Sequence, residues 1–128
     1  MVSPNGPPRR WSLSPAVQRL AFDWYQVKLF AQHASGISMD ALHVIAGTLL
    51  LFAAAWLLRT SVARPLPLLV VLLAELINEA SDFRAEIWPQ LAMQAGEAGK
   101  DVITTMVVPL LIFLAARYRA ALFAYKSS

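Results

Sequence analysis

The sequence predicts an all-α integral membrane protein with about three transmembrane helices and an N-terminal amphipathic helix at the membrane interface. Of its 128 residues, 58% are hydrophobic and only 15% are charged, whereas soluble domains average roughly 45–50% apolar and about 25% charged residues. The apolar residues also gather in long uncharged runs. This composition argues against a disordered chain and a typical cytosolic enzyme. A formal charge of +3 is too small to suggest a nucleic-acid partner, and the lack of cysteine excludes disulfides and thiolate chemistry.

The first part of the chain is expected to lie outside the bilayer core. Residues 1–12 are rich in proline, glycine and arginine, which predicts a flexible tail. Residues 13–35 are predicted to form the amphipathic helix, because Ser14 and Pro15 fit an N-cap and a first helical position, and apolar residues follow at helical spacing. Its charges are too many for a span, so the helix is expected to lie in the interface. Packing against the other helices is the open alternative.

Residues 39–123 are predicted to form a membrane domain of three spans. Residues 41–58 contain no formal charge over eighteen positions, which meets the length requirement for a transmembrane helix. Residues 65–80 and 102–116 are shorter apolar segments. They can also span if their polar ends face protein or water. The expected connections are a short hairpin at 59–65 and a longer polar connection at about 81–99.

Alternating directions would bring the polar ends of the three segments to one membrane face. The start of the first, the end of the second and the start of the third then lie together, as one polar pocket. The side chains expected to act as acid or base are His43, Glu75 and Glu79. Those expected to bind are Asn78, Asp82, Asp101 and Thr104. Glu75, Asn78, Glu79 and Asp82 share one helix face, because they are spaced i, i+3, i+4 and i+7.

Several roles are compatible with such a pocket. It could relay protons, bind a divalent cation through histidine and carboxylates, or supply an acid and a base to a lipid-linked substrate. It could also do no chemistry, its polar groups satisfying one another to fix helix packing. No metal site is predicted, since ligand spacings such as Glu-x-x-His are absent, and the sequence indicates no particular cofactor.

These same residues give the chain a resemblance to the VanZ-like family, as a divergent and shortened member. The resemblance covers about residues 40–117. It consists of the histidine at Leu42-His43, the acidic end of the second segment from Glu75 to Glu79, and the aspartate of Lys100-Asp101 that opens the last segment. The family comprises small membrane proteins associated with glycopeptide (teicoplanin) resistance. The resemblance implies a role in the cell envelope and assigns no catalytic residue.

Two functions from different classes are therefore expected. The first is a small polytopic protein of the bacterial inner membrane whose one-sided pocket binds or processes an envelope or lipid-linked molecule. The second is a non-catalytic accessory or assembly subunit of a larger membrane complex, or a small lysis-type membrane protein. An ion-coupled transporter is less favoured because three spans are few. The expected partners are the lipid bilayer and either a lipid-linked substrate or a larger complex, with no nucleic acid. The sequence leaves open whether the protein is an enzyme.

Overall fold

The structure is a computed structural model that describes residues 14–86 and 88–123, with the side chains of the last helix described to residue 119. The described residues form four helices. They are α1 (Pro15–Ser35), α2 (Met39–Leu57), α3 (Pro65–Ala85) and α4 (Leu91–Phe123). The described residues are thus all helix and connection, as predicted. The predicted tail at 1–12 lies outside the described residues.

Local sequence explains where the first three helices begin. Proline occupies the first turn of α1 and α3, where the missing N–H costs no helical hydrogen bond. The Ser38 hydroxyl caps α2 by accepting a hydrogen bond from the backbone N–H of Ala41, at 3.2 Å. Gly36 ends α1 in the left-handed conformation (φ 68°), and its N–H donates to the Gln32 carbonyl.

The connections differ in one place from those expected. The residues predicted as a long polar connection at about 81–99 are mostly helical, because α3 continues to Ala85 and α4 begins at Leu91. Three turns of α4 therefore precede its apolar part. The polar residues in this segment mark the end of the apolar runs and do not mark the end of helical structure.

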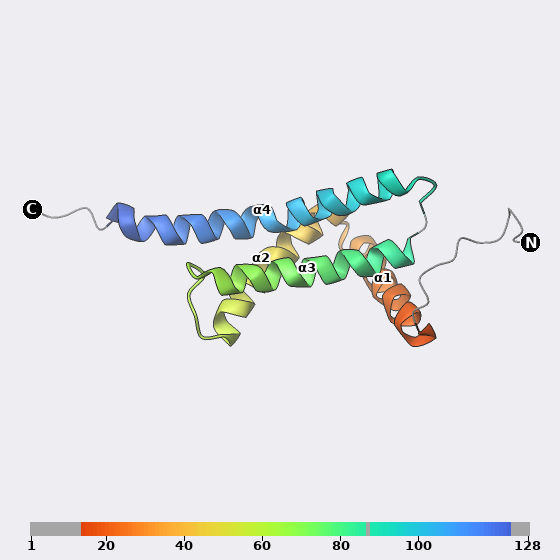
Figure 1. Ribbon diagram of the computed structural model, residues 1–128, viewed down its shortest axis with the longest axis horizontal. Coiled ribbons are helices and arrows are strands. Elements are labelled where there is room, and N and C mark those ends of the chain that lie inside the picture. Colours follow the sequence, from red (N-terminus) through yellow and green to blue (C-terminus); the bar gives the residue numbers. More distant parts are fainter. Residues whose placement is uncertain (1–13, 87, 124–128) are drawn as a thin grey trace, which may run out of the picture.

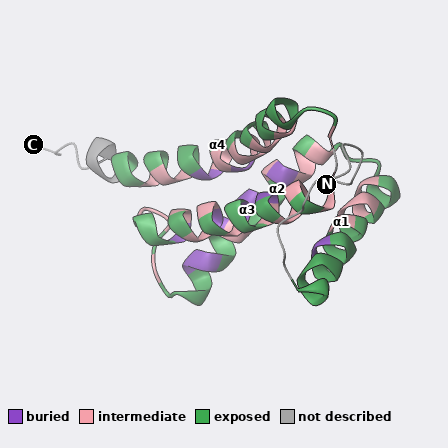
Figure 2. Ribbon diagram, turned by 45° about the vertical axis from the view of Figure 1, so that its right-hand side comes forward, coloured by how far each residue is buried: buried purple, intermediate pink, exposed green. Residues whose placement is uncertain are grey.

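Helices α2, α3 and α4 run in alternating directions and pack against one another (Figure 1). Helix α1 lies apart from this group and packs mainly on the C-terminal half of α3. The buried residues gather where α2, α3 and α4 meet, whereas α1 is exposed along most of its length (Figure 2). Alternating directions place the start of α2, the end of α3 and the polar part of α4 at one end of the bundle.

The core of this bundle is narrow and depends on small residues. Leu51 and Val71 are fully buried and Ala54 is nearly so. At Gly47 the backbones of α2 and α4 approach so closely that an added Cβ would lie 2.5 Å from the carbonyl oxygen of Thr105. Close approach through small residues is typical of helix packing in membranes.

Two helices among the described residues are long and apolar enough to cross a membrane, namely Met39–Leu57 and Leu91–Arg119. Few of their residues are buried inside the protein, and large side chains such as Leu49 and Trp56 are 65% and 78% exposed. Helix α3 has 21 residues but carries carboxylates through its C-terminal half, so it is not one of the two. The described residues therefore form helices and their connections, with two candidate spans where three were predicted.

Candidate functional site

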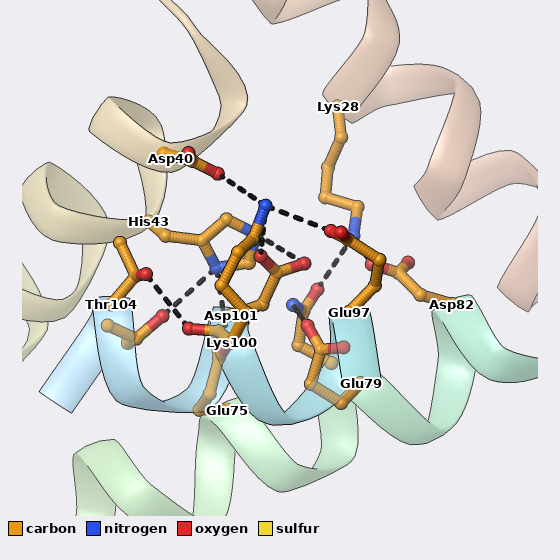
Figure 3. Close-up of polar contacts among 12 residues, drawn as sticks. Lys28, Asp40, His43, Glu75, Glu79, Asp82, Glu97, Lys100, Asp101 and Thr104 are labelled. Atoms are coloured by element: carbon orange, nitrogen blue, oxygen red, sulfur yellow. Dashed lines mark hydrogen bonds and ion pairs between the residues drawn. The ribbon is translucent and has the colours of Figure 1, made fainter. Parts of the chain in front are cut away.

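The polar end of the bundle collects ionisable side chains from all four helices (Figure 3). Helix α2 contributes its first two turns, α3 its C-terminal half, α4 the turns around Asp101, and α1 a lysine from its middle. The predicted site residues in this cluster are His43, Glu75, Asn78, Glu79, Asp82 and Asp101. The alternation of helix directions explains why residues so far apart in sequence meet here.

His43 lies at the centre of this cluster and is 6% exposed. Its Nδ1 atom is 3.0 Å from the Thr105 hydroxyl oxygen and 3.1 Å from Oε1 of Glu75. On the other side of the ring, Nε2 is 3.8 Å from Oδ2 of Asp101. The imidazole therefore has a carboxylate near each nitrogen, an arrangement that can hold a proton or orient the ring for another ligand.

Glu75 and Glu79 lie one turn apart on α3 and are each 7% exposed. The side-chain amide of Asn78 donates to Oε1 of Glu79 at 3.2 Å. Oε1 of Glu75 is buried and accepts no hydrogen bond, although His43 Nδ1 is close to it. A buried acceptor without a donor is costly, and Oδ1 of Asp82 is a second such oxygen among the described residues of the cluster.

Helix α1 adds two residues that the sequence analysis did not assign to the site. Lys28 pairs with Asp82 and donates to Oδ1 of Asn78 at 3.2 Å. The indole N–H of Trp24 donates to the same Oδ1 at 2.8 Å. Trp24 and Lys28 are spaced i, i+4, so their shared helix face was readable in the sequence, but its partner on α3 was not.

Tyr25, the residue after Trp24, also lies near the acidic end of α3. Partial burial raises the pKa of Tyr25, and the negative charges of Glu86 and Asp82 raise it further. The end of α3 thus presents an acidic surface to α1. Lys28 is the α1 side chain that compensates it.

Lys100 forms the exposed rim of the site. Its ammonium group lies 3.2 Å from Asp40, 2.9 Å from Glu97 and 3.8 Å from Asp101. The first two pairs join half-exposed side chains, where ion pairs contribute little to stability. The pair with Asp40 joins α4 to the start of α2, whereas the pair with Glu97 lies within α4.

The structure places Thr105, and not Thr104, against the histidine. The Thr104 hydroxyl donates to the carbonyl of Lys100 within its own helix, at 2.8 Å. Thr105 is buried and faces α2. One residue along a helix turns the side chain by about 100°, so a sequence pattern without the neighbouring helix cannot choose between adjacent threonines.

A groove of about 520 Å³ leads to these residues from the surface of the bundle. Its walls come from apolar residues of α1, α2 and α3, among them Val27, Leu49 and Val71. Polar groups line it at His43, Glu75, Asn78, Thr105 and Lys28. The groove therefore has mainly apolar walls and a few polar groups, of which His43, Glu75 and Thr105 are buried.

No protein-family model matches this sequence, and neither a curated protein nor a solved structure matches it. The site is accordingly interpreted from its own geometry.

Proposed function

We propose that this chain is a small polytopic protein of the bacterial inner membrane, of the VanZ-like type, whose groove binds or processes a lipid-linked molecule of the cell envelope. Helices α2, α3 and α4 are the three spans in this proposal, and α1 lies in the interface. The observation that carries it is the groove of about 520 Å³, whose mainly apolar walls include the buried polar groups of His43, Glu75 and Thr105.

The distribution of side chains on α3 supports a third span. Glu75 and Glu79 are buried against the other helices, while Leu69, Leu73 and Ile77 are more than half exposed. Ionisable residues within a membrane normally face protein or a water-filled cavity. The carboxylates that make α3 too polar for a simple span are therefore the ones withdrawn from lipid.

The groove suits an amphiphile. Its apolar walls include Ile45 and Leu49, which are exposed and would continue the lipid-facing surface of α2. A chain could enter there sideways from the bilayer, and its head group would meet His43, Glu75 and Asn78. These groups offer mainly acceptors, so they favour a head group with hydrogen-bond donors, as hydroxyls of a lipid-linked sugar provide. If the bound molecule is processed, His43 beside Glu75 is the acid–base group.

Photolabelling of the purified full chain tests the proposal. The probe is a diacyl glycolipid with a diazirine in one acyl chain, and the labelled peptides are identified by mass spectrometry. We expect saturable labelling of the groove residues, competed by the same glycolipid without the diazirine. Ala46→Phe should reduce this labelling several-fold, because Ala46 lines the groove.

Ala53→Phe is the matched control, since Ala53 is exposed two turns further along the same helix and does not line the groove. Labelling spread evenly over the exposed helices, and equal in the two variants, would contradict the proposal. A stoichiometric protein that co-purifies and covers the groove would instead support the accessory-subunit function.

A further inference from the structure

The centre of the cluster presents three metal-ligating side chains to one point. One ligand atom each from His43, Glu75 and Glu79 lies within 4.8 Å of the other two, and all three side chains are buried. We propose that these residues bind one divalent transition-metal cation, with Zn²⁺ as the probe because imidazole and carboxylate are both zinc ligands. This inference goes beyond lipid binding by the groove and can be tested without any lipid.

The distance between two of the donors fits a shared metal ion. Zinc ligands lie about 2.0–2.1 Å from the ion, which places two donors of a tetrahedral site about 3.3 Å apart. His43 Nδ1 and Glu75 Oε1 are 3.1 Å apart. The two atoms are close enough for an ion pair, but Oε1 of Glu75 has no hydrogen-bond partner of good geometry. The separation of these two atoms therefore matches that of two ligands of one metal ion.

The unpaired Oε1 of Glu75 is a second observation that favours a bound cation. Glu75 is 93% buried, and its Oε1 accepts no hydrogen bond. In the metal-free chain Nδ1 of His43 lies at ion-pair distance from this oxygen, and a cation bound by both atoms would also satisfy the unpaired acceptor.

The charge balance of the site favours a divalent ion. When both are ionised, the two buried carboxylates carry two negative charges, and burying charge without compensation is expensive. The lysines of the cluster pair with other carboxylates, Lys28 with Asp82 and Lys100 with Asp40 and Glu97. A divalent cation with a neutral His43 brings Glu75 and Glu79 to neutrality.

The surroundings of His43 prepare its ring for this role. Asp101 Oδ2 lies 3.8 Å from Nε2, longer than a hydrogen bond, and its charge favours a proton on that nitrogen. The Nδ1 lone pair then accepts from the Thr105 hydroxyl in the metal-free chain and would turn to the metal on binding. A carboxylate behind a metal-binding histidine is a common second partner that fixes its tautomer. Asp101 is a positioning residue in this arrangement. The groove reaches His43 and Glu75, so a fourth coordination position can face a bound molecule.

No metal site was predicted from the sequence, because no segment has a ligand spacing such as Glu-x-x-His. Glu75 and Glu79 do share one turn of α3, but their third partner comes from α2. Only the packing of α2 on α3 assembles the set.

Metal titration of the full chain in mild detergent tests the site. The protein is purified with a histidine-free affinity tag, stripped with a chelator and titrated with Zn²⁺ alone, followed by calorimetry and elemental analysis. We expect one ion per chain. Co²⁺ should give the visible absorption of a tetrahedral site with nitrogen and oxygen ligands. Glu75→Gln and Glu79→Gln should each abolish stoichiometric binding, whereas Glu97→Gln, a rim carboxylate, should retain it.

Asp101→Asn keeps the test decisive if a ligand variant fails to fold. This variant retains all three ligands, and we expect its Zn²⁺ affinity to fall about 10–100-fold with circular dichroism unchanged. Equal binding by Glu75→Gln and Glu97→Gln, or no saturable binding by the folded wild-type chain, would overturn the proposal. Glycolipid photolabelling of the chelated protein is scored separately, so either proposal can fail while the other stands.

Discussion

Gly47 of α2 and Thr105 of α4 meet backbone to backbone. A Cβ on Gly47 would lie 2.5 Å from the Thr105 carbonyl oxygen and 2.8 Å from its side-chain methyl group. Pro109 lies four residues after Thr105 and has no N–H, so the helix supplies no i→i−4 donor to that carbonyl. This contact lies one turn from His43 and brings the Thr105 hydroxyl within 3.0 Å of Nδ1. The close packing of α2 on α4 at Gly47 therefore also sets the position of Thr105 beside His43.

Gly47→Ala should separate α2 from α4 and destabilise the protein. Introducing volume into a packed contact costs about 1–3 kcal/mol, and the displaced atom here is a backbone oxygen that cannot rotate away. Thermal unfolding in detergent measures the effect. Gly96→Ala is the control, because a Cβ there meets nothing within 4 Å and alanine favours a helix over glycine by about 1 kcal/mol. An unchanged unfolding temperature for Gly47→Ala would contradict the close contact.

Thr105→Val should lower stability by about 1 kcal/mol, since it keeps the shape but removes the hydroxyl that bonds to buried His43. Thr104→Val loses only a hydrogen bond to its own helix and should change stability by a few tenths of a kcal/mol at most. Denaturation of the two variants side by side gives the comparison. A larger loss for Thr104→Val than for Thr105→Val would reverse the assignment of these residues.

Lys28→Met should release α1 from α3. The change leaves Asp82 without its ion-pair partner and removes one donor to Asn78. An uncompensated, mostly buried charge is strongly destabilising, so hydrogen exchange should accelerate about tenfold or more within α1. Exchange in α2 should stay as in the wild type, because α1 packs mainly on α3. The double variant with Asp82→Asn should recover part of the protection; no recovery would show that the pair is not coupled.

Acidification should release the proposed metal ion. Protons compete with the cation for imidazole and carboxylates, so metal affinity depends on pH. We expect the Zn²⁺ affinity of the wild-type chain to fall steadily as the pH is lowered from neutral, with proton release on binding visible as a buffer-dependent heat. A pH-independent affinity, with no proton released, would indicate binding by groups other than His43.

Much of the fold was readable from the sequence. The 3.6-residue periodicity predicted α1, and the uncharged run at 41–58 predicted α2 almost to its ends. The boundary between α3 and α4 was wrong, because polarity at 81–99 was taken for a connection. Helix formation depends on local backbone preferences, and glutamate, glutamine, lysine and alanine all favour a helix. The polarity of a segment indicates only whether it faces water or an apolar environment.

The site was predicted in part. Alternating helix directions grouped His43, Glu75, Glu79 and Asp101 correctly, because consecutive helices joined by short connections run in opposite directions. The contributions of Trp24 and Lys28 could not be predicted, since nothing in the sequence indicates how α1 lies on α3. The choice of Thr105 over Thr104 depended on the rotation of α4, which the contact at Gly47 fixes.

The sequence by itself determined the helices, their apolar character and the end of the bundle at which the polar groups collect, because these depend on local pattern and chain direction. Only the tertiary structure decided which ligand atoms face one another. Contacts within 3–4 Å depend on the rotation and spacing of whole helices, and one small residue, Gly47, sets both for α2 and α4.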